Sequence, residues 1–331
     1  MDDRIRALDE WLAAVLAGAR FRLETASADA SFRRYFRVFL ADRTLIAMDA
    51  PPKREDSRPF VKVARLLRAA GLNAPEILAQ DLDQGFLLVS DLGTRSYLAA
   101  LREGDADRLF GDATTALVRW QSESRPGVLP EYDEALLRRE LELFPEWYLG
   151  RHLGMVLVTA QREALDAIFR RILERNLAEP RVYVHRDYMP RNLMVAEPNP
   201  GILDFQDAVH GPISYDVASL FRDAFISWEE DRVLDGTIRY WEKARRAALP
   251  VRGDFADFWR DVEWMGLQRH LKVLGIFARL HYRDGKKGYL EDAPRFAGYV
   301  RHAVARYGEL APLGRLLDEA QGRAPRAGYT F

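Results

Sequence analysis

The residues best suited to chemistry lie within residues 183–195, where a histidine, an aspartate and an asparagine follow the pattern H-x-D-x-x-x-x-N. They are His185, Asp187 and Asn192, and a second carboxylate, Asp204, lies twelve residues after Asn192. Phosphoryl transfer requires a base for the acceptor hydroxyl and oxygen ligands for the Mg²⁺ that accompanies a nucleotide. These residue types at this spacing therefore predict a phosphotransferase that acts on an alcohol.

Each of these four side chains has a role that its chemistry suggests. Asp187 is the predicted catalytic base, and His185 is predicted to orient the loop through hydrogen bonds. Asn192 and Asp204 are the predicted Mg²⁺ ligands, because hard oxygen donors suit that ion. The structural alternatives are caps of a turn or strand end for the two aspartates and a turn residue for Asn192. Their occurrence together in one stretch favours the catalytic interpretation.

The segments around this stretch predict how its side chains are held. Apolar runs flank the loop, and residues 198–201 contain two prolines, an asparagine and a glycine, which predict a hairpin between Asn192 and Asp204. Asp216 opens an apolar helix, so we predict a structural role for it as a cap or as a partner of the loop backbone. Arg191 is a candidate for contacting the substrate or a phosphate.

The composition limits the class of protein. The chain has 331 residues with 48% hydrophobic residues and a net charge of −1, which predicts two folded lobes and argues against nucleic acid as a partner. It contains no cysteine, so disulfides and thiolate chemistry are excluded. No apolar run reaches the roughly 18 residues that span a membrane, and the N-terminus lacks a signal pattern. A cytoplasmic monomer with no membrane partner and no obligate protein partner is expected.

The patterning predicts an α+β fold with two lobes. Residues 1–91 form a small nucleotide-binding lobe with an antiparallel sheet, led by a helix over residues 2–17. Residues 92–331 form a larger, mainly helical lobe with the catalytic loop and the acceptor site. Strands are predicted over residues 21–25, 34–39, 44–49, 76–80 and 86–90, with a helix over 57–70. Later helices are predicted over residues 106–122, 133–151, 159–178, 213–226, 228–247, 253–282 and 292–307.

Two segments of the small lobe are candidates for contacting the nucleotide. Residues 27–32 are mostly small and lie between two predicted strands, so their backbone N–H groups could cover the phosphates, although a plain hairpin turn fits equally well. The contact residues there are Ser27, Ser31 and Phe32, followed by Arg33 and Arg34. At the end of the lobe, position alone suggests that an adenine would meet the backbone of Ser90, Asp91 and Leu92.

Several blocks of the sequence resemble the aminoglycoside phosphotransferase-like kinases, a family with the bilobal protein-kinase-like fold. Within it they are most similar to bacterial kinases of cell-wall amino sugars. The similarity extends over nearly the whole chain, and residues 48–52 and 135–148 are the blocks most specific to that group. The blocks are residues 27–36, 48–52, 135–148, 184–194, 203–208 and 268–278.

The resemblance implies an activity and its cofactors. It implies ATP and Mg²⁺ as cofactors, and phosphorylation of the anomeric hydroxyl of N-acetylmuramate and N-acetylglucosamine. The product would be the α-1-phosphate, which returns recycled peptidoglycan sugar towards UDP-N-acetylmuramate. The alternatives are a kinase of the same fold acting on an aminoglycoside, choline or homoserine, and a nucleotide-binding pseudokinase without turnover.

The third predicted strand departs from the usual pattern of this fold. Kinases of this fold carry a lysine there that holds the α- and β-phosphates, whereas this chain has Met48. A thioether cannot replace an ammonium group, so Lys53, Lys62, Arg33 or Arg34 are candidates for the missing charge. The same block marks the resembled amino-sugar kinases, so the loss is interpreted as a trait of that group rather than as inactivation.

The acceptor site is expected in the helical lobe near Asp187. An arginine there could pair with the lactyl carboxylate of N-acetylmuramate. The candidate residues are Arg138, Glu142, Arg222, Gln268 and Arg269, beside Arg191 of the loop.

Overall fold

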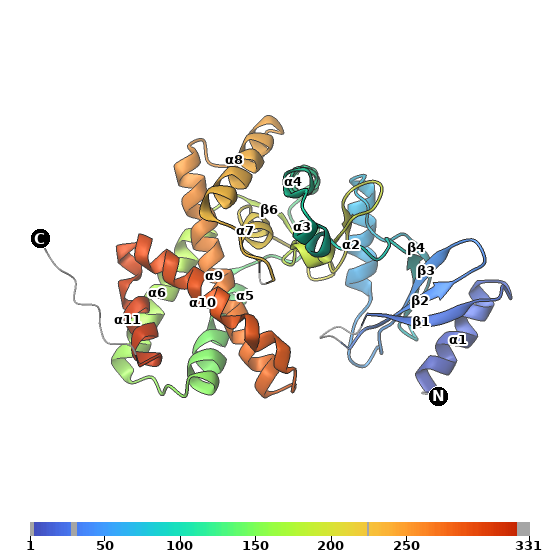
Figure 1. Cartoon of the computed structure of the whole chain (residues 1–331), viewed down its shortest axis with the longest axis horizontal. Helices are drawn as coiled ribbons and strands as arrows, with labels where there is room; N and C mark the ends of the chain where they lie inside the picture. The colour runs from blue at the N-terminus through green and yellow to red at the C-terminus, as the bar shows by residue number, and fades with distance from the viewer. Residues whose placement is uncertain (1–2, 28–31, 224, 323–331) are drawn as a thin grey trace, which may run out of the picture. The chain divides into compact units, whose positions relative to one another are not determined.

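The computed structural model describes residues 3–27, 32–223 and 225–322 (Figure 1). By packing, the chain divides into two compact units. The first contains the chain up to Trp120 together with Pro190–Ala208, and the second contains Gln121–Met189 and the chain from Val209 onward. The predicted functional boundary between residues 91 and 92 stays a prediction.

The first unit is built on one five-stranded antiparallel sheet with the strand order β1-β2-β3-β5-β4. Helix α1 (Asp3–Val15) lies beside the strands in Figure 1, and α2 (Arg58–Ala69) connects β3 to β4. The first residue of the helix predicted over 2–17 lies outside the described residues. The strands are β1 (Arg22–Ser27), β2 (Arg34–Phe39), β3 (Thr44–Asp49), β4 (Ile77–Asp81) and β5 (Phe86–Ser90).

Alternation of side chains along β2 gives the sheet two different faces. Phe36 and Val38 point toward α1 and join Leu8 and Leu12 in one buried hydrophobic cluster. Each fully buried side chain of this kind contributes about 1.5–3 kcal/mol relative to an exposed one. Tyr35, which pairs with Met48 of β3, belongs to the opposite face.

The rest of the first unit surrounds a short hairpin. Strands β7 (Leu193–Met194) and β8 (Gly201–Ile202) pair antiparallel, directly after a single 3-10 turn over Pro190–Asn192. Helices α3 (Tyr97–Glu103) and α4 (Ala106–Ser122) precede this region in the sequence. The hairpin predicted between Asn192 and Asp204 is thus present.

The second unit is mainly helical and is centred on the long helix α9 (Phe255–Tyr282), which is buried along most of its length. Helices α5, α6, α7 and α10 contact it, and their ribbons can be followed by label in Figure 1. Strands β6 (Arg181–Val184) and β9 (Val209–Pro212) form a two-stranded sheet. The other elements are α5 (Glu134–Leu143), a π-helix (Phe144–His152), α6 (Thr159–Leu177), α7 (Tyr215–Phe221), α8 (Glu230–Arg246), α10 (Ala293–Arg306) and α11 (Ala311–Ala320), with 3-10 turns at Lys287–Asp292 and Gly308–Leu310.

This architecture confirms the predicted α+β class, with an antiparallel sheet followed by a mainly helical region. The helix predicted over residues 133–151 is different, because its α-helical part ends at Leu143 and a π-helix follows. Pro145 has no N–H with which to continue the α-helical ladder. In addition, Gly275 of α9 lies so close that a Cβ there would be 2.4 Å from the carbonyl of Leu143.

Four further elements differ from the sequence prediction. Strand β9 and the helices α3 and α11 were not predicted, and α7 ends at Phe221 rather than near residue 226. Strand β9 is only four residues long, and its pairing with β6 depends on residues far away in the sequence. None of the described helices is both long and apolar enough to cross a membrane.

Candidate active site

A cavity of about 350 Å³ opens within the first unit, between the face of the sheet that carries Tyr35 and the β7–β8 hairpin. It contains residues from both of the regions that were predicted to contact a nucleotide and its metal ion. Its walls are formed by Ala26, Tyr35, Arg37, Ile46, Phe60, Pro75, Val89, Ser90, Asp91, Leu92, Gly93, Thr94, Ser96, Arg191, Asn192, Met194, Leu203 and Asp204.

One part of this cavity is apolar. Ile46 and Val89 pair across β3 and β5 and form the wall on the side of the sheet, whereas Met194 and Leu203 come from the hairpin region. Ligand cavities combine such apolar walls with a few polar groups that fix the orientation of the ligand. Ser90, Asp91 and Leu92 also line the cavity, and their contact with an adenine stays a prediction.

The polar part of the cavity contains the two predicted metal ligands. The β7–β8 hairpin brings Asn192 and Asp204 together, with 3.2 Å between the Asn192 amide nitrogen and a carboxylate oxygen of Asp204. The Gln206 amide donates to the other carboxylate oxygen at 2.8 Å. Carboxamide and carboxylate oxygens are donors that Mg²⁺ takes from proteins, together with waters and phosphates, so the two residue types brought together here fit that ion. Gln206, which orients Asp204, was missed in the sequence.

Arg37 is a second residue of the cavity that the sequence analysis missed. Its guanidinium donates to both carboxylate oxygens of Asp91 at 2.6 and 3.2 Å and to the carbonyl of Gly93 at 3.0 Å. Burial opposes the ionisation of Asp91, but hydrogen bonds from Arg37, Thr44 and the Gly93 N–H, together with the charge of Arg37, outweigh it and lower the pKa of the carboxyl group. This ion pair therefore fixes the segment that follows β5.

The segment predicted to cover the phosphates is only partly described. Ser31 lies outside the described residues, and Ser27 is the last residue of β1. Phe32 is 55% exposed and lies 4.6 Å from the guanidinium of Arg54. The contacts of Arg33 and Arg34 are considered below, and the role of the whole segment stays a prediction.

In the second unit, the loop that carries Asp187 is held through its backbone. Asp216, at the start of α7, accepts hydrogen bonds from the N–H groups of His185 at 2.7 Å and of Arg186 at 3.0 Å. Arg186 has a φ of +74°, a left-handed conformation that costs a non-glycine residue on the order of 1–3 kcal/mol. Burial raises the pKa of Asp216 to about 7, although both backbone hydrogen bonds favour its charged form. The structural role predicted for Asp216 matches these contacts.

His185 lies inside this loop. Its Nδ1 accepts a hydrogen bond from the N–H of Asp187 at 3.3 Å, and its ring meets that of Tyr188 edge-on. The N–H of Met189 donates to the carbonyl of Asp187 at 2.9 Å, which closes a tight turn around the aspartate. These contacts shape the backbone on both sides of Asp187, and the orienting role of His185 stays a prediction.

A buried ionic group next to this loop was not predicted. The Glu140 carboxylate of α5 accepts from the side chains of Arg186 and Tyr132, and its Oε1 lies 2.9 Å from Lys272 Nζ of α9. Burial opposes the ionisation of Glu140, but Lys272 and Arg186 outweigh it and lower its pKa. Glu140 thus connects two helices to the residue immediately before Asp187. These contacts join positions far apart in the sequence, so no local pattern could reveal them.

Two of the predicted acceptor residues belong to an ion-pair cluster on α5 and α6. Arg138 contacts Glu142 at 2.9 Å and Asp166 at 2.5 Å, and Arg162 contacts Glu142 at 2.8 Å. These side chains are about one-third exposed and form hydrogen bonds to one another. Their role toward a substrate stays a prediction.

The other acceptor candidates of the helical unit are buried. Arg269 donates to the carbonyl of Arg222 at 3.4 Å, and its other amine lies 3.6 Å from the Met189 sulfur of the catalytic loop. The guanidinium of Arg222 lies 5.8 Å from the centre of the Trp259 ring. Gln268 donates to the carbonyl of Leu137. Among these residues, Arg269 is therefore placed beside the predicted catalytic loop.

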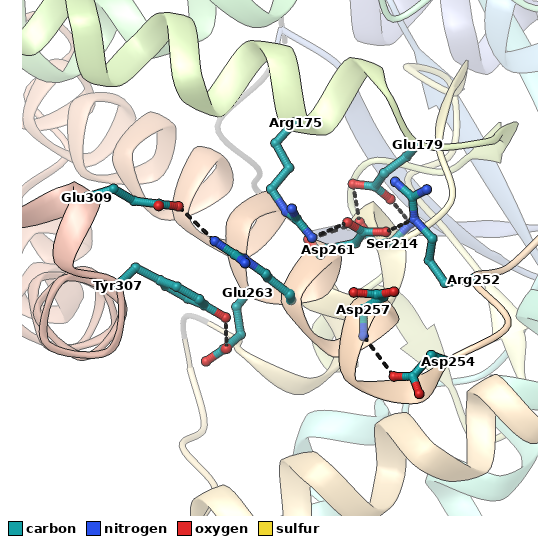
Figure 2. A network of polar contacts seen from close by, with 11 residues as sticks. Arg175, Glu179, Ser214, Arg252, Asp254, Asp257, Asp261, Glu263, Tyr307 and Glu309 are labelled. Atoms are coloured by element: carbon teal, nitrogen blue, oxygen red, sulfur yellow. Dashed lines mark hydrogen bonds and ion pairs between the residues drawn. The ribbon is translucent and has the colours of Figure 1, made fainter.

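A polar network fixes the start of α7, which carries Asp216 (Figure 2). Glu179 accepts hydrogen bonds from the N–H and the hydroxyl of Ser214 at 3.2 and 2.9 Å. Asp261 of α9 lies between Arg175 and Arg252, each at 2.9 Å. Burial, followed by the nearby Asp261 carboxylate, raises the pKa of Glu179 to about 8. Through Ser214, this network holds the start of α7, and Asp216 of that helix bonds to the loop backbone.

One group outside the predicted site has the residue types of a metal site. Carboxylate and imidazole atoms of Glu230, Glu263 and His302 lie within 4.8 Å of one another. However, Arg306 forms ion pairs with both glutamates, and Tyr307 donates to Glu263. These partners give the group a structural role without an ion.

The fold and these residues define a phosphotransferase of the kinase type. Residues 22–251 match the model of the phosphotransferase enzyme family, and the chain belongs to that family. The match includes the sheet, the cavity and the loop that carries Asp187. The class predicted from the sequence is thus confirmed.

Relatives support the same class, and a solved structure shares the fold. The chain is 59% identical over 292 residues to the N-acetylmuramate/N-acetylglucosamine kinase of Pseudomonas aeruginosa, covering 88% of this chain and 86% of that protein. It is 49% identical to the protein of the same name from Neisseria meningitidis, covering 98% of each chain. A choline kinase from Streptococcus pneumoniae shares the fold, with a TM-score of 0.67 at 12% identity, covering 92% of this chain and all of that one (100%).

Proposed function

We propose that this protein transfers the γ-phosphoryl group of MgATP to the anomeric hydroxyl of N-acetylmuramate and N-acetylglucosamine. The product is the sugar α-1-phosphate, which serves peptidoglycan recycling towards UDP-N-acetylmuramate. The observation that carries this proposal is the 49% identity, over 98% of both chains, to a relative named for that activity. The complete set of His185, Asp187, Asn192 and Asp204 supports turnover rather than nucleotide binding alone.

The cavity of the first unit is the proposed nucleotide site. Ile46 and Val89 on one side and Met194 and Leu203 on the other would enclose the adenine ring. Backbone groups of residues 90–92 would pair with its edge. Asn192 and Asp204 would hold Mg²⁺, which when bound neutralises charge on the β- and γ-phosphates.

Asp187 is the proposed base in the second unit. Its carboxylate accepts the proton of the anomeric hydroxyl, and that oxygen bonds to the γ-phosphorus as the bond from phosphorus to the β-phosphate oxygen breaks. ADP leaves with the electron pair of that bond. An anomeric hydroxyl is more acidic than an ordinary alcohol, so positioning and charge neutralisation supply most of the rate. Arg269 and Arg222 are the proposed partners of the acceptor sugar, and the chain is proposed to act as a monomer.

A transfer assay with a panel of acceptors tests this function. MgATP is supplied with N-acetylmuramate, N-acetylglucosamine, choline, homoserine or an aminoglycoside, and ADP formation is followed. We expect turnover with the two amino sugars, at a kcat/KM at least about 100-fold above that for the other acceptors. Turnover with choline or an aminoglycoside alone would assign a different substrate class. Nucleotide binding with no turnover on any acceptor would indicate a pseudokinase.

A further inference from the structure

In kinases of this fold, a lysine holds the nucleotide phosphates and an acidic residue pairs with that lysine. Neither residue is present on the corresponding elements of this chain. The lysine is usually on the third strand and pairs with a glutamate of the helix that follows. Here Met48 occupies β3 with its side chain fully buried, and α2 (Arg58–Ala69) contains no acidic residue. The negative charge of a triphosphate requires a cation, which must come from another position.

The geometry of β2 separates the two adjacent arginines. Tyr35 and Arg37 both line the nucleotide cavity, so odd-numbered side chains of β2 point to that face. Arg34 points to the opposite face, where its guanidinium binds the buried carboxylate of Asp49 with atoms 2.5 and 3.0 Å apart. Arg4 of α1 also pairs with Asp49. The guanidinium of Arg34 therefore pairs with Asp49 on the side of the sheet that faces α1.

Arg33 immediately precedes β2, and extending the alternation of the strand by one residue assigns it to the odd-numbered face. One of its terminal nitrogens lies 3.0 Å from Glu55 Oε2, and the two side chains are only 10% and 19% exposed. Glu55 lies in the segment between β3 and α2. The pair of Arg33 and Glu55 thus joins the sheet to the entry of the helix, as the usual pair of lysine and glutamate does.

We propose that Arg33 replaces the missing strand lysine as the cation for the nucleotide phosphates, and that Glu55 is its positioning residue. This inference rests on the proposed nucleotide site. A guanidinium is always charged and has five N–H donors in a planar fork, so it can keep its bond to Glu55 while it donates to phosphate oxygens. The other candidates are placed less favourably. Lys53 is exposed, and Lys62 lines a separate hollow on α2 together with Arg58 and Arg65.

Binding measurements with two nucleoside ligands test the role of Arg33. Isothermal titration with ATP and with adenosine, in the absence of sugar, compares wild type, Arg33→Ala, Arg33→Lys and Arg43→Ala. Arg43 is an exposed arginine in the turn between β2 and β3, so its removal changes the net charge equally. We expect Arg33→Ala to weaken ATP binding by about 10- to 100-fold with adenosine binding unchanged, because adenosine has no phosphate. Arg33→Lys should retain part of the affinity, and Arg43→Ala all of it.

Other results would overturn the assignment. Wild-type affinity of Arg33→Ala for ATP excludes Arg33 as the phosphate cation, and an equal loss of ATP and adenosine binding indicates a purely structural role. Glu55→Gln should lower kcat about tenfold while ATP affinity changes by less than about threefold, because the charge of Arg33 remains but its position is lost. An unchanged kcat in that variant removes the positioning role.

The ATP titrations and the transfer assay together separate this inference from the proposed function. A wild-type protein that binds ATP but does not phosphorylate an amino sugar contradicts the proposed function and leaves the binding comparison valid. A wild-type protein with the expected sugar kinase activity, together with an Arg33→Ala variant of normal ATP affinity, contradicts only the role of Arg33.

Discussion

Asp187 is the residue on which the proposed chemistry depends most. Its replacement by alanine removes the base and leaves the nucleotide cavity intact, because all residues that line the cavity belong to the first unit. We expect kcat to fall by about 10²–10⁴-fold, the usual contribution of a general base, with ATP affinity unchanged. Steady-state kinetics and isothermal titration measure the two quantities. Full activity of Asp187→Ala would refute its assignment as the base.

Asp204 is expected to determine how Mg²⁺ affects nucleotide binding. In the wild type, ATP should bind more tightly with Mg²⁺ than without it, because the proposed ligands Asn192 and Asp204 would share the ion with the phosphates. We expect Asp204→Ala to abolish this difference. Titrations of ATP with Mg²⁺ and with a chelator measure it, and Asp207→Ala, which removes an exposed carboxylate three residues away, is the matched control. If Mg²⁺ still strengthens ATP binding in Asp204→Ala, the metal-ligand assignment is wrong.

At the scale of residues, local patterns predicted some contacts and could not predict others. Asn192 and Asp204 could be placed together because a short hairpin separates them. In contrast, the contacts of Arg37 with Asp91 and of Glu140 with Lys272 join residues that lie far apart in the sequence. Such pairs form only when strands or helices pack, so neither residue has a local signal that indicates its partner.

Glu140 is expected to affect kcat, because it connects two helices to the loop that carries Asp187. Replacing this residue by glutamine leaves Arg186 and Lys272 without their shared carboxylate. Since breaking a buried ionic group costs up to about 3–5 kcal/mol, the variant should unfold at a lower temperature. The loop should also lose its fixed position, so that kcat falls by about 10- to 100-fold. Differential scanning calorimetry and steady-state kinetics measure both effects.

A matched variant on the same helix separates position from charge. Glu134 lies in the first turn of α5 and is exposed, so Glu134→Gln removes one negative charge without affecting the loop. We expect wild-type kcat and unfolding temperature for it, and unchanged ATP affinity for both variants. If Glu140→Gln has the same kcat as Glu134→Gln, Glu140 does not position the loop.

At the scale of elements, periodicity predicted the long helices and the strands of the sheet. It did not predict the π-helix over Phe144–His152, because π-helices are rare and this segment is packed against α9, a contact that the local pattern does not reveal. The close approach of Gly275 to Leu143 that accompanies it is a contact between two elements. Strand β9 is short and is recognisable only through its partner β6.

The stability of the whole molecule should depend on pH through Glu179. Its pKa is raised to about 8 in the folded protein from an ordinary value of 4.5. Between these values the folded protein holds a proton that the unfolded chain releases, so the free energy of unfolding should fall as the pH rises from about 4.5 to 8. We expect Glu179→Gln to unfold at a higher temperature than wild type at pH 8.5. The two should converge near pH 5, where Glu179 is neutral in the folded protein.

Thermal unfolding from pH 5 to pH 8.5 measures this difference. Each kcal/mol of unfolding free energy that Glu179→Gln gains corresponds to an increase of roughly 2–4 °C in the unfolding temperature for domains of this size. Glu163→Gln on α6, the helix that ends shortly before Glu179, is the control, because Glu163 is exposed and its replacement removes one carboxylate at the surface. A constant difference between Glu179→Gln and wild type across this pH range would contradict the assigned cause.

At the scale of the whole molecule, the proposed binding and catalytic roles are divided between the two units. The first holds the cavity with Asn192 and Asp204, and the second holds Asp187 and the candidate acceptor residues. The boundary falls between Met189 and Pro190, within the motif that identified the chemistry. The sequence predicted the fold class and the reaction type from that motif. It could not show that residues 190–208 pack with the sheet in the first unit, because this packing depends on long-range contacts.

The most direct test of the central claim is the identity of the product. N-acetylmuramate is incubated with MgATP and the protein, and the product is analysed by ³¹P NMR with coupling to protons. We predict one new phosphomonoester signal coupled to the anomeric proton of the α-sugar, which is absent with Asp187→Ala. A signal coupled to the protons at carbon 6, or ADP formation without any sugar phosphate, would contradict the proposed anomeric kinase.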